Sequence, residues 1–496
     1  MPALIYRAND VRELDRRAIK EHDLPGIELM TRAGEAAWHL LCATWPRARR
    51  IAVVCGPGNN GGDGYVVARL ARVAGRDVSA LQVADVRTPR SDAGVARDAC
   101  AKAGVPVLPF SADTVMKADV VVDALLGTGL ERDVEGEFHA AIETVNKSSS
   151  PVFSIDIPSG LHADTGHIMG AAVRADATMT FVGLKAGLFT GEGRTCAGAI
   201  YFDDLGVPQD VYDGIAPRAQ RIRTADLAGL LPARVASAHK GDFGRVLIIG
   251  GNHGMAGACS LAALAAYRTG AGYVSVATRP EHIAAVMGVC PEALVHGVAD
   301  AAALAPLLKH KDVVVVGPGL GQDNWARELF AAALDSESPM VVDADGLNLL
   351  ATEPRSRPDW VLTPHPGEAG RLLGVSTSQV QGDRFASVEQ LAQRFGGTCV
   401  LKGSGTLIRN GANNWLCDRG TPAMASAGMG DVLTGVIAAL IGQRVTPPLA
   451  ARAAVWLHAV AGEVAASGGK RLSVRASDLF DPLARQLSVL VDCGPA

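Results

Sequence analysis

The chain has 496 residues, of which 48% are hydrophobic and 20% are charged, and its formal net charge is −4. This is ordinary globular composition, and at roughly 100–200 residues per domain the length predicts about two to four domains. Because the sequence lacks a dense run of Lys and Arg, nucleic acid is a poor candidate partner.

The nine Cys are scattered without a CxxC pair or a Cys/His cluster. That pattern argues against a zinc site or a disulfide framework and favours a reducing compartment. The N-terminal residues 1–17 are polar and lack the apolar core of a signal peptide. The longest apolar helix that the sequence predicts, residues 432–441, is too short to span a bilayer. Together these features predict a soluble cytoplasmic protein with no membrane partner.

Two helical patterns open the chain. The first covers residues 9–22, with Asn9 in the N-cap position. The second covers residues 26–41 and carries an apolar stripe, whose Met30 and Trp38 we expect in the core or at an interface rather than at a cofactor.

Short continuous runs rich in Val and Ile, each with Gly or Asp near its end, follow at residues 51–55, 120–123, 152–157, 246–250, 313–317 and 340–343. Such runs are typical of strands that are buried on both faces of a parallel sheet. Because helical patterns separate them, the sequence predicts an α/β protein with doubly wound sheets, in which ligands bind beyond the carboxyl ends of the strands.

The two halves repeat this strand-to-loop pattern at comparable spacing. Either the halves arose by duplication or, as we prefer, independent parallel sheets reuse the same solution. Between Asp210 and Ser237 the sequence mixes Pro, charge and short apolar pieces without long periodicity, which is typical of a domain boundary. We therefore expect two domains, at residues 1–220 and 225–496, each with a largely parallel doubly wound sheet.

The segment GPGNNGGDG, residues 56–64, follows a predicted strand and opens a helix. Its small residues let backbone N–H groups approach an anion at the helix N-terminus. The side chains of Asn59, Asn60 and Asp63 add contacts. A tight turn alone is the alternative, but it would not need five Gly within nine residues.

Two further loops follow the next two predicted strands. In DALLGTGLERD, Gly127 and Gly129 make a flexible loop, whereas Arg132 and Asp133 can face either a ligand or water. In SIDIPSG, Asp156 ends a strand, where a carboxylate in a ligand cleft is suited to act as a general acid or base. Helix capping is the alternative role for this carboxylate.

Three oxygen-bearing side chains, Asn60, Asp123 and Ser159, follow neighbouring strands and can gather a hard monovalent cation. The motifs NNGGDG, DALLGTG and DIPSG, in this order and spacing, resemble those of the NAD(P)HX epimerase family over residues 1–215. That family interconverts the R and S forms of NADH or NADPH hydrated at C6 of the nicotinamide ring. The resemblance implies that these three side chains bind K⁺. The residues that it places on the hydrate are Asn59, Asn60, Gly61, Gly62, Asp63, Gly127, Thr128, Gly129, Leu130, Glu131, Arg132, Asp133 and Asp156.

The chemistry of the hydrate suits these residues. Since C6 bears both the hydroxyl group and the ring nitrogen, it is a hemiaminal carbon that can lose its configuration reversibly with modest acid–base help. One positioned carboxylate contributes typically ~10²–10⁴-fold, which suits Asp156 as the catalytic residue. Ring opening and transient loss of hydroxide remain alternative routes.

The second half begins with a strand whose Gly-rich exit leads into an Ala-rich helix, residues 258–269, with Gly270 as its C′ residue. GPGLG, residues 317–321, is another strand-to-loop crossing. In DADGL, Asp343 and Asp345 stand at the next strand end, where they can contact substrate or a metal-bound water. Helix N-capping is the alternative role for Asp345.

Two later strands lead into TPHPGE and KGSGT. Two Pro flank His365 and pin its backbone, which favours a positioned contact. Glu368 lies in the first turn of the following helix, where capping is the alternative role. Lys402 stands at a strand end and is followed by Gly, Ser and Thr, a combination that suits phosphate oxygens.

The segment SAGMGD leads into the apolar helix. The N–H groups of residues 428–430 form an anion hole at the helix N-terminus. Asp431 can accept the proton of a substrate hydroxyl group that attacks a terminal phosphoryl group. A helix cap alone would not need such a Gly loop.

SAGMGD resembles the ribokinase-like superfamily and, with GMAGA, GPGLG, DADGL, TPHPGE and KGSGT, the ADP-dependent NAD(P)HX dehydratase over residues 225–490. His365 stands where many ribokinase relatives carry Asn, which argues against an ordinary sugar or vitamin kinase. The resemblance implies Mg²⁺ with ADP near Glu368, mostly through water, and Asp431 as the catalytic base. Its hydrate contacts are Ala258, Gly319, His365 and Asp431. Its adenine-nucleotide contacts are Lys402, Gly403, Ser404, Gly405, Thr406 and Gly430.

Together the resemblances imply a bifunctional enzyme that acts on NADHX, NADPHX and ADP. Phosphorylating the C6 oxygen makes it leave as phosphate, which restores the reduced ring and gives AMP. Only the S form is expected to fit, so the epimerase supplies it from the R form. Two rival hypotheses are a small-molecule kinase with a regulatory N-terminal half and an N-terminal binding or scaffold module. The residues leave open ADP against ATP, NADHX against NADPHX, and whether the chain forms a homo-oligomer.

Overall fold

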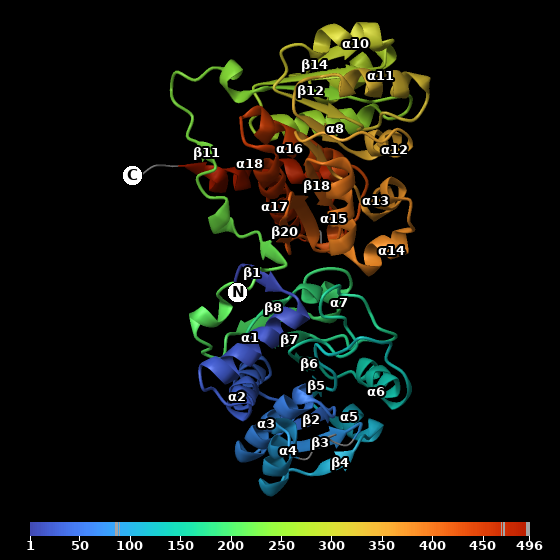
Figure 1. The fold of residues 1–496 in the computed structure, drawn as a ribbon. Helices are drawn as coiled ribbons and strands as arrows, with labels where there is room; N and C mark the ends of the chain where they lie inside the picture. The colour runs from blue at the N-terminus through green and yellow to red at the C-terminus, as the bar shows by residue number, and fades with distance from the viewer. Residues whose placement is uncertain (85–87, 89, 468, 470–471, 493–496) are drawn as a thin grey trace. The chain divides into compact units, whose positions relative to one another are not determined.

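The computed structural model describes residues 1–496 except 85–87, 89, 468, 470–471 and 493–496. The chain divides into two compact units, Met1–Gln220 and Arg221–Ala496. Each unit contains a predominantly parallel sheet with helices on both faces (Figure 1). The α/β, doubly wound class that the strand patterns predict is confirmed.

The N-terminal unit has a parallel sheet in the order β4-β3-β2-β5-β6-β7-β9. Its strands are β2 Arg50–Cys55, β3 Asp77–Gln82, β4 Val107–Pro109, β5 Val120–Ala124, β6 Val152–Ile155, β7 Ala177–Phe181 and β9 Ala199–Asp203. Every residue of β5, β6 and β7 is buried, which explains why the sequence shows continuous apolar runs rather than alternation. A short strand, β1 Leu4–Tyr6, pairs with β8 Leu184–Lys185 and β10 Ala219–Arg221.

Helices cover both faces of this sheet. They are α1 Ala8–Glu21, α2 Gly26–Thr44, α3 Asn59–Val73, α4 Asp92–Lys102, α5 Ala112–Lys117, α6 Gly136–Lys147 and α7 Gly193–Cys196, with 3-10 turns η1 Ala186–Leu188 and η2 Gln209–Tyr212. Val53 packs into a core shared with Met30 and Trp38 of α2, as the apolar stripe predicts. Its neighbour Val54 points to the opposite face, where Ile142 of α6 covers it.

The first helix begins earlier than the sequence predicts. The N-cap of α1 is Arg7, not Asn9, because the Asp10 carboxylate accepts the backbone N–H of Arg7 at 3.0 Å. Asn9 lies inside the first turn, and its side chain accepts a hydrogen bond from Arg12. The acidic residue at the third position of the helix, Asp10, therefore satisfies the N–H group of the cap residue, and the expected cap Asn9 does not.

The C-terminal unit has strands in the order β14-β13-β12-β15-β16-β17-β18-β19-β20. They are β12 Arg245–Ile249, β13 Tyr273–Thr278, β14 Leu294–Gly297, β15 Val313–Val316, β16 Met340–Val342, β17 Trp360–Leu362, β18 Thr398–Leu401, β19 Thr406–Asn410 and β20 Asn413–Cys417. Pairing is parallel from β14 to β18 and antiparallel through β19 and β20. A separate short pair joins β11 Leu231–Pro232 to β21 Val491–Asp492.

The helices of this unit are α8 Ala256–Arg268, α9 Ile283–Val289, α10 Ala301–Leu308, α11 Asn324–Leu334, α12 Ala344–Thr352, α13 Pro366–Leu373, α14 Thr377–Gly382, α15 Arg384–Phe395, α16 Met429–Gly442, α17 Pro447–Ser467 and α18 Phe480–Gln486. Its 3-10 turns are η3 Thr224–Asp226, η4 Lys240–Phe243, η5 Pro280–His282, η6 Pro422–Met424, η7 Ala476–Leu479 and η8 Leu487–Leu490. The predicted C′ residue of α8, Gly270, has the expected positive φ of +98°.

Helix α17 is a longer apolar helix than the one predicted at residues 432–441. It is long and apolar enough to cross a membrane by length and composition, but 67% of its most apolar window is buried inside the unit. Arg452, His458 and Glu463 interrupt its Ala-rich sequence, which hid its continuity. Because Trp456 lies in the main hydrophobic cluster with α16, α17 is a core helix here.

Both sheets reverse their strand order at one point, and the loops that follow the two neighbouring strands diverge there. In the first unit β2 lies between β3 and β5; in the second, β12 lies between β13 and β15. Glycine is required at each crossing, since a Cβ on Gly56 would lie 1.7 Å from the Leu125 carbonyl oxygen and one on Gly250 would lie 2.0 Å from that of Pro318. Such switch points are where doubly wound sheets bind ligands.

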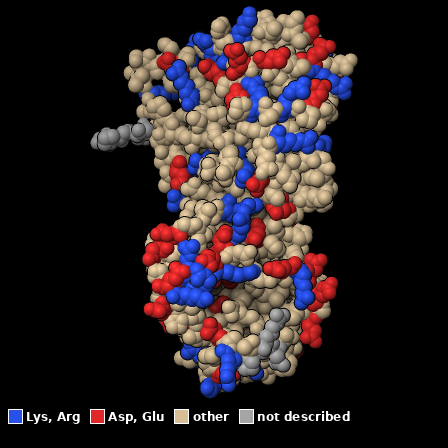
Figure 2. Space-filling model, viewed as in Figure 1, with Lys and Arg blue, Asp and Glu red and all other residues tan. Residues whose placement is uncertain are grey.

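The charged surface agrees with the balanced composition. On the face drawn in Figure 2, blue and red side chains are interspersed over both units rather than gathered by sign. The described residues thus show no continuous basic stripe on that face of the kind that nucleic-acid binding uses.

Candidate active sites

The first site begins at the N-terminus of α3. Its loop passes very close to the crossing, because a Cβ on Gly61 would lie 2.0 Å from the carbonyl oxygen of Gly56. Small residues thus bring the backbone N–H groups at the start of α3 to the switch point, as the sequence predicts. Asn59 is exposed there, and Asn60 is buried.

Asp123, at the end of β5, is the hub of a buried polar cluster. Its carboxylate accepts the Ser159 hydroxyl group at 2.5 Å, the Ser159 backbone N–H at 2.9 Å and the Ser154 hydroxyl group at 2.8 Å. Burial raises the pKa of Asp123, while the hydrogen bonds from Ser159 and Ser154 oppose that shift. This carboxylate is therefore a fixed acceptor rather than a mobile acid.

Asn60 joins the same cluster through Leu126. Its Nδ2 donates to the Leu126 carbonyl oxygen at 2.9 Å, and the Leu126 N–H donates to the Ser159 hydroxyl oxygen at 2.7 Å. The Asn60 Oδ1 atom is buried without a hydrogen-bond partner. The fold therefore brings Asn60, Asp123 and Ser159 together, and it leaves an unsatisfied amide oxygen, a good ligand for a cation, among them.

Asp156 follows β6 and adopts a φ of +66°, a costly backbone conformation for a non-Gly residue that is typical of functional sites. Its Oδ1 accepts a hydrogen bond from Lys185 Nζ, and its side chain is 18% exposed. Lys185 Nζ also donates to the Thr180 hydroxyl oxygen at 3.1 Å and the Phe181 carbonyl oxygen at 2.9 Å. Asp156 begins no helix, so the capping alternative is wrong.

Two further carboxyl groups share the electrostatic field of Asp156. Burial, reinforced by the charge of Asp156, raises the pKa of Asp63 well above its usual value. Burial raises the pKa of Asp15 to about 6, although Lys185 opposes the shift. The cluster therefore combines a carboxyl group of raised pKa, Asp63, with the Lys185–Asp156 ion pair, an arrangement suited to proton transfer.

Neither Lys185 nor Asp15 was predicted from the sequence as a site residue. Lys185 lies in the apolar, Gly-rich segment FVGLKAGLFT and is 1% exposed. A lysine within such a run is a usable signal, because a fully buried lysine needs a charged partner. Asp15 gave no signal, since acidic residues are common on amphipathic helices such as α1.

The loop after β5 is more open than these clusters. Gly129, Glu131, Arg132 and Asp133 are exposed, so the solvated alternative for Arg132 and Asp133 agrees with their positions. The loop is also held from α1, since Arg12 donates to the Thr128 carbonyl oxygen at 2.9 Å.

The second site is centred on the N-terminus of α16. Gly428 caps this helix with a φ of +87°, a left-handed conformation that suits Gly. A Cβ on Gly430 would lie 3.2 Å from Asp343 Oδ2 and 3.3 Å from Lys402 Nζ. The structure therefore brings Asp343 and Lys402, from two strand ends, against the Gly loop of the predicted anion hole.

Lys402 is held by two acidic side chains. Its Nζ lies 2.7 Å from Asp343 Oδ1 and 3.8 Å from Glu368 Oε2, and Thr434 donates to Asp343 Oδ2 at 2.9 Å. Burial alone would lower the pKa of Lys402, but the two carboxylates raise it, so the lysine is charged. Lys402 is 19% exposed at its side chain, which leaves room for an incoming anion.

Asp431 lies in the first turn of α16 and has a strongly perturbed acidity. Burial, reinforced by the charge of Asp343, raises the pKa of Asp431 to about 7, against the opposing charge of Lys402. Burial raises the pKa of Glu368 to about 7 as well. A carboxylate with a pKa near neutrality is well matched to general-base catalysis.

His365 and Glu368 form a reciprocal cap on α13. His365 Nδ1 accepts the N–H groups of Gly367 and Glu368, and Glu368 Oε2 accepts the His365 N–H at 2.7 Å. The capping alternative for Glu368 is thus correct, and His365 also serves as a cap. Because Nδ1 is an acceptor, the neutral ring carries its proton on Nε2, and His365 remains about half exposed.

Arg384, which was not predicted from the sequence, holds the loop of residues 402–406 through hydrogen bonds to its backbone. Its Nη2 donates to the carbonyl oxygens of Leu401 at 3.1 Å, Lys402 at 3.2 Å and Gly405 at 3.4 Å. The residue is 1% exposed. It gave no sequence signal, because an arginine at the start of a helix is usually solvated.

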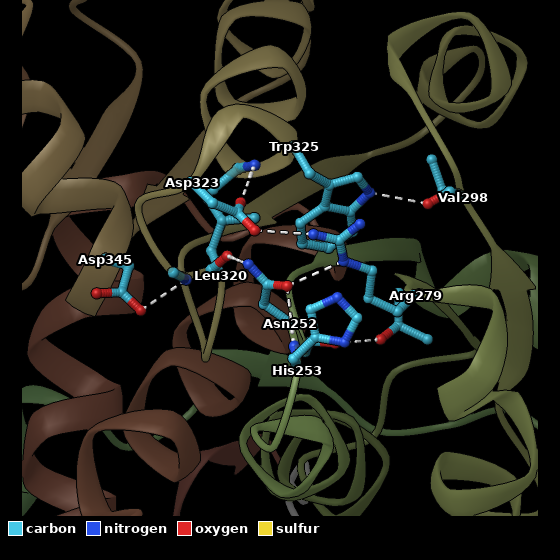
Figure 3. Close-up of polar contacts among 12 residues, drawn as sticks. Asn252, His253, Arg279, Val298, Leu320, Asp323, Trp325 and Asp345 are labelled. Atoms are coloured by element: carbon cyan, nitrogen blue, oxygen red, sulfur yellow. Dashed lines mark hydrogen bonds and ion pairs between the residues drawn. The ribbon is translucent and has the colours of Figure 1, made fainter.

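Figure 3 shows how the loop of residues 317–321 is held. Asn252 Nδ2 donates to the Leu320 carbonyl oxygen at 3.0 Å, and Asn252 Oδ1 accepts Arg279 Nε at 2.9 Å. Arg279 also binds Asp323 at 2.8 Å and stacks 4.3 Å from the centre of the Trp325 ring. These contacts, which the sequence did not predict, fix the two Gly-rich loops at the switch point.

The predicted contact residues Ala258 and Gly319 are neighbours in this region, since a Cβ on Gly319 would lie 3.1 Å from that of Ala258. Asp345 accepts the Gly321 N–H at 2.8 Å, so its carboxylate holds the loop and the alternative capping role is wrong. The N-cap position of α12 belongs to Asp343, whose side chain is occupied by Lys402 and Thr434.

The two units therefore define a two-site α/β enzyme, whose C-terminal unit has the ribokinase-like fold with an Asp at a Gly-lined helix N-terminus. Residues 246–485 match the family described as NAD(P)H-hydrate dehydratase, and residues 26–187 match the family described as YjeF-related protein N-terminus. The chain belongs to the family of bifunctional NAD(P)H-hydrate repair enzymes.

Similarity to individual proteins supports this membership. The chain is 44% identical to the bifunctional NAD(P)H-hydrate repair enzyme Nnr of Coxiella burnetii, over 97% of this chain and 98% of that protein. It is 42% identical to the enzyme of the same name from Escherichia coli, over 98% and 94% of the two chains. A crystal structure of a ribokinase-like superfamily protein from Enterococcus faecalis aligns with a TM-score of 0.51 and 27% identity, covering 55% of this chain and 97% of that one.

Proposed function

We propose that this chain repairs hydrated NADH and NADPH. The unit Met1–Gln220 epimerises R- and S-NAD(P)HX, and the unit Arg221–Ala496 dehydrates the S form with ADP. Family membership supports both activities. The observation that carries the proposal is the convergence of Asp431, Lys402 and Gly430 at the N-terminus of α16, since this is an anion site with a base of matched pKa.

Dehydration starts with Asp431. Its carboxylate accepts the proton of the C6 hydroxyl group as that oxygen attacks the terminal phosphorus of ADP, and the bond between the two phosphates breaks to give AMP. The ring nitrogen lone pair then expels phosphate from C6. Loss of a proton from C5 restores the dihydropyridine ring of NADH or NADPH.

The remaining contacts follow from the same placement. Lys402 and the N–H groups near Gly430 stabilise charge on the transferred phosphoryl group. We assign the adenine nucleotide to Lys402, Gly403, Ser404, Gly405, Thr406 and Gly430. We assign the hydrate to Ala258, Gly319, His365 and Asp431.

The protein side chains supply only part of the coordination that a magnesium ion would need at this site. Among the described residues no three His, Cys, Asp or Glu side chains gather into a metal site. Glu368, buried beside Lys402, is the carboxylate placed to hold the ion through water. Bound with ADP, Mg²⁺ would neutralise phosphate charge.

The pH dependence of dehydration follows from the pKa of Asp431. Because the pKa of about 7 belongs to a group that must be ionised to accept a proton, kcat/KM for dehydration is expected to rise with pH through about 7 and then level off. The measurement is a pH profile with S-NADHX, ADP and Mg²⁺. A profile that already lies on its plateau at the ordinary pKa of an aspartate would contradict the role of Asp431 as base.

Epimerisation uses the Asp156 cluster. Lys185 holds Asp156 in an ion pair and orients it, and the pKa of the Asp63 carboxyl group in the same cluster is raised. One group of this pair can take a proton from the C6 hydroxyl group while the other returns one. The proposed hydrate contacts are Asn59, Asn60, Gly61, Gly62, Asp63, Gly127, Thr128, Gly129, Leu130, Glu131, Arg132, Asp133 and Asp156.

A potassium ion fits the cluster of Asn60, Asp123 and Ser159. The support is the buried, unpartnered Oδ1 of Asn60 beside the carboxylate of Asp123. The ion would satisfy this oxygen and balance the buried charge, which fixes the loop of residues 125–130 that faces the hydrate.

Epimerisation is therefore expected to depend on K⁺, whereas dehydration of S-NADHX is not expected to depend on the cluster. Replacing K⁺ by a large organic cation should slow the exchange of R- and S-NADHX, followed by chromatography. Asn60→Ala should remove the response to K⁺ and also the K⁺-dependent rise in melting temperature that binding to the folded state requires. Equal epimerisation rates in both salts would argue against the site.

The assay that tests the whole proposal is incubation of mixed R- and S-NADHX with ADP and Mg²⁺, followed by the absorbance of reduced nicotinamide. We expect full recovery of NADH with AMP and phosphate as products, and slower or no recovery with ATP in place of ADP. A stable phosphorylated hydrate without NADH would favour the small-molecule kinase. The described Cys residues are all free thiols, which supports our placing of this activity in the reducing cytoplasm.

A further inference from the structure

A groove of about 500 Å³ opens in the C-terminal unit beside the loop of residues 317–321. Its lining residues are Gln322, Asn348, Ala351, Thr352 and Arg371. None of them belongs to the hydrate or nucleotide contacts assigned above. The volume lies within the range of about 300–1,000 Å³ that small-molecule sites occupy.

A chain of hydrogen bonds connects this groove to the proposed hydrate site. The Gly321 N–H donates to Asp345 Oδ2 at 2.8 Å, a contact drawn in Figure 3, and Asn348 Nδ2 donates to Asp345 Oδ1 at 3.2 Å. Asn348 Oδ1 in turn accepts Arg371 Nε at 2.7 Å. The loop that carries Gly319 and the side chain of Arg371 are therefore positioned by one network.

Arg371 is the positive charge of the groove. It lies on α13, the helix that His365 caps. Its charge helps to lower the pKa of His365 and opposes the rise in the pKa of Glu368. Among the residues that the structure describes, Arg371 forms no ion pair. Its exposed guanidinium group is oriented through Nε only, and the other N–H groups suit an anion.

We propose that this groove binds the distal, adenosine-bearing half of the hydrated dinucleotide and that Arg371 binds one of its phosphate groups. This inference rests on the proposed dehydration. With the hydrated ring at Asp431 and His365, the loop that carries Gly319 offers the rest of the dinucleotide a route to the groove, because the hydrogen-bond network joins this loop to Arg371. The proposed nucleotide contacts lie in the loop after β18 and at the start of α16, whereas the groove is lined by residues of α12 and α13 and by Gln322, which follows the loop of residues 317–321.

Gln322, Asn348 and Thr352 supply polar groups for the ribose and adenine, and Ala351 supplies an apolar surface. The phosphate that Arg371 binds comes either from the pyrophosphate, which NADHX and NADPHX share, or from the 2′-phosphate, which only NADPHX carries. The same side chain would in the second case set the preference between the two substrates.

The test uses the full chain with Arg371→Gln and Arg371→Lys. Arg355→Gln is the control, because it removes an exposed positive charge that does not line the groove. Initial rates are measured with S-NADHX and with S-NADPHX at saturating ADP. Since hydrogen bonds to charged groups are among the stronger ones, Arg371→Gln should raise the KM of the hydrate by about 10-fold or more. The kcat and the KM of ADP should stay unchanged, and Arg371→Lys should restore part of the affinity.

A rise in KM for both hydrates assigns Arg371 to the pyrophosphate, and a rise for NADPHX alone assigns it to the 2′-phosphate. Unchanged KM values for both hydrates in Arg371→Gln, or equal changes in Arg355→Gln, overturn the proposal. If wild-type protein forms no NADH, the proposed function fails first, and that outcome is distinct.

Exposed Thr352 offers a second variant in case Arg371→Gln lowers the melting temperature. Thr352→Glu places a negative charge in the same groove and should raise the KM of the hydrate, whereas Thr352→Gln should not. Direct titration of S-NADPHX into Asp431→Asn protein with and without Thr352→Glu measures the same loss without turnover. Equal affinities in that titration would also overturn the proposal.

Discussion

Asp431→Asn is expected to abolish dehydration of S-NADHX while R- and S-NADHX still interconvert at the wild-type rate. The amide cannot take the proton of the C6 hydroxyl group, so phosphorylation of that oxygen should slow by about 10²–10⁴-fold. The loss reflects missing base catalysis rather than missing space, since Asn has nearly the same shape as Asp. Formation of NADH by absorbance, and exchange of the two hydrates by chromatography, measure the activities separately.

The control for this variant is its own epimerase activity, because that site lies in a separate compact unit. Loss of both activities from Asp431→Asn protein with an unchanged melting temperature would contradict the assignment of two independent sites. So would retention of near wild-type dehydration.

Asp156→Asn should have the complementary effect. Epimerisation should fall by about 10²–10⁴-fold, because the amide can neither accept the proton nor form the ion pair with Lys185. Dehydration of pure S-NADHX should be unchanged. With mixed hydrates, NADH should appear rapidly from the S form and then stop, leaving R-NADHX behind.

Thr178→Ser is a suitable comparison for Asp156→Asn, since Thr178 lies on β7 of the same sheet and donates to Ala197 rather than to the cluster. It should leave epimerisation near wild type. If Asp156→Asn protein instead consumed all of a mixed hydrate sample as quickly as wild type, the proton-transfer role of Asp156 would be wrong.

The strands were predictable because burial on both faces of the sheet produces a continuous apolar run in the local sequence. The run at residues 51–55 lies within β2, and the run at residues 313–317 covers β15 and one residue beyond it. The glycines at 56, 61 and 428 were equally visible, since close backbone approach and positive φ exclude other residues at such positions. These features depend on the neighbouring sequence and on general rules of sheet winding.

The support of the sites was not predictable, because it joins residues that are far apart in sequence. Lys185 is 29 residues from Asp156, and Asn252 is 68 residues from Leu320. A hydrogen bond across that distance exists only once the sheet has formed. The pKa of Asp431 has the same origin, since it depends on burial and on Asp343 from another strand end.

At helix α17 and at the cap of α1, the local sequence was visible but gave the wrong prediction. The charged residues Arg452 and Glu463 made the sequence of α17 resemble an ordinary surface segment, although Trp456 lies in the core. At α1, Asp10 competed successfully with Asn9 for the role of satisfying the helix end. In both cases the contacts made in the folded chain override the local sequence preference.

The central claim is that the C6 oxygen of the hydrate leaves as part of phosphate after Asp431 has taken its proton. It is tested most directly with S-NADHX that carries heavy oxygen in the C6 hydroxyl group, in ordinary water with ADP and Mg²⁺. The account predicts one labelled oxygen atom in each inorganic phosphate released. Unlabelled phosphate, with the heavy oxygen lost to water, would contradict it.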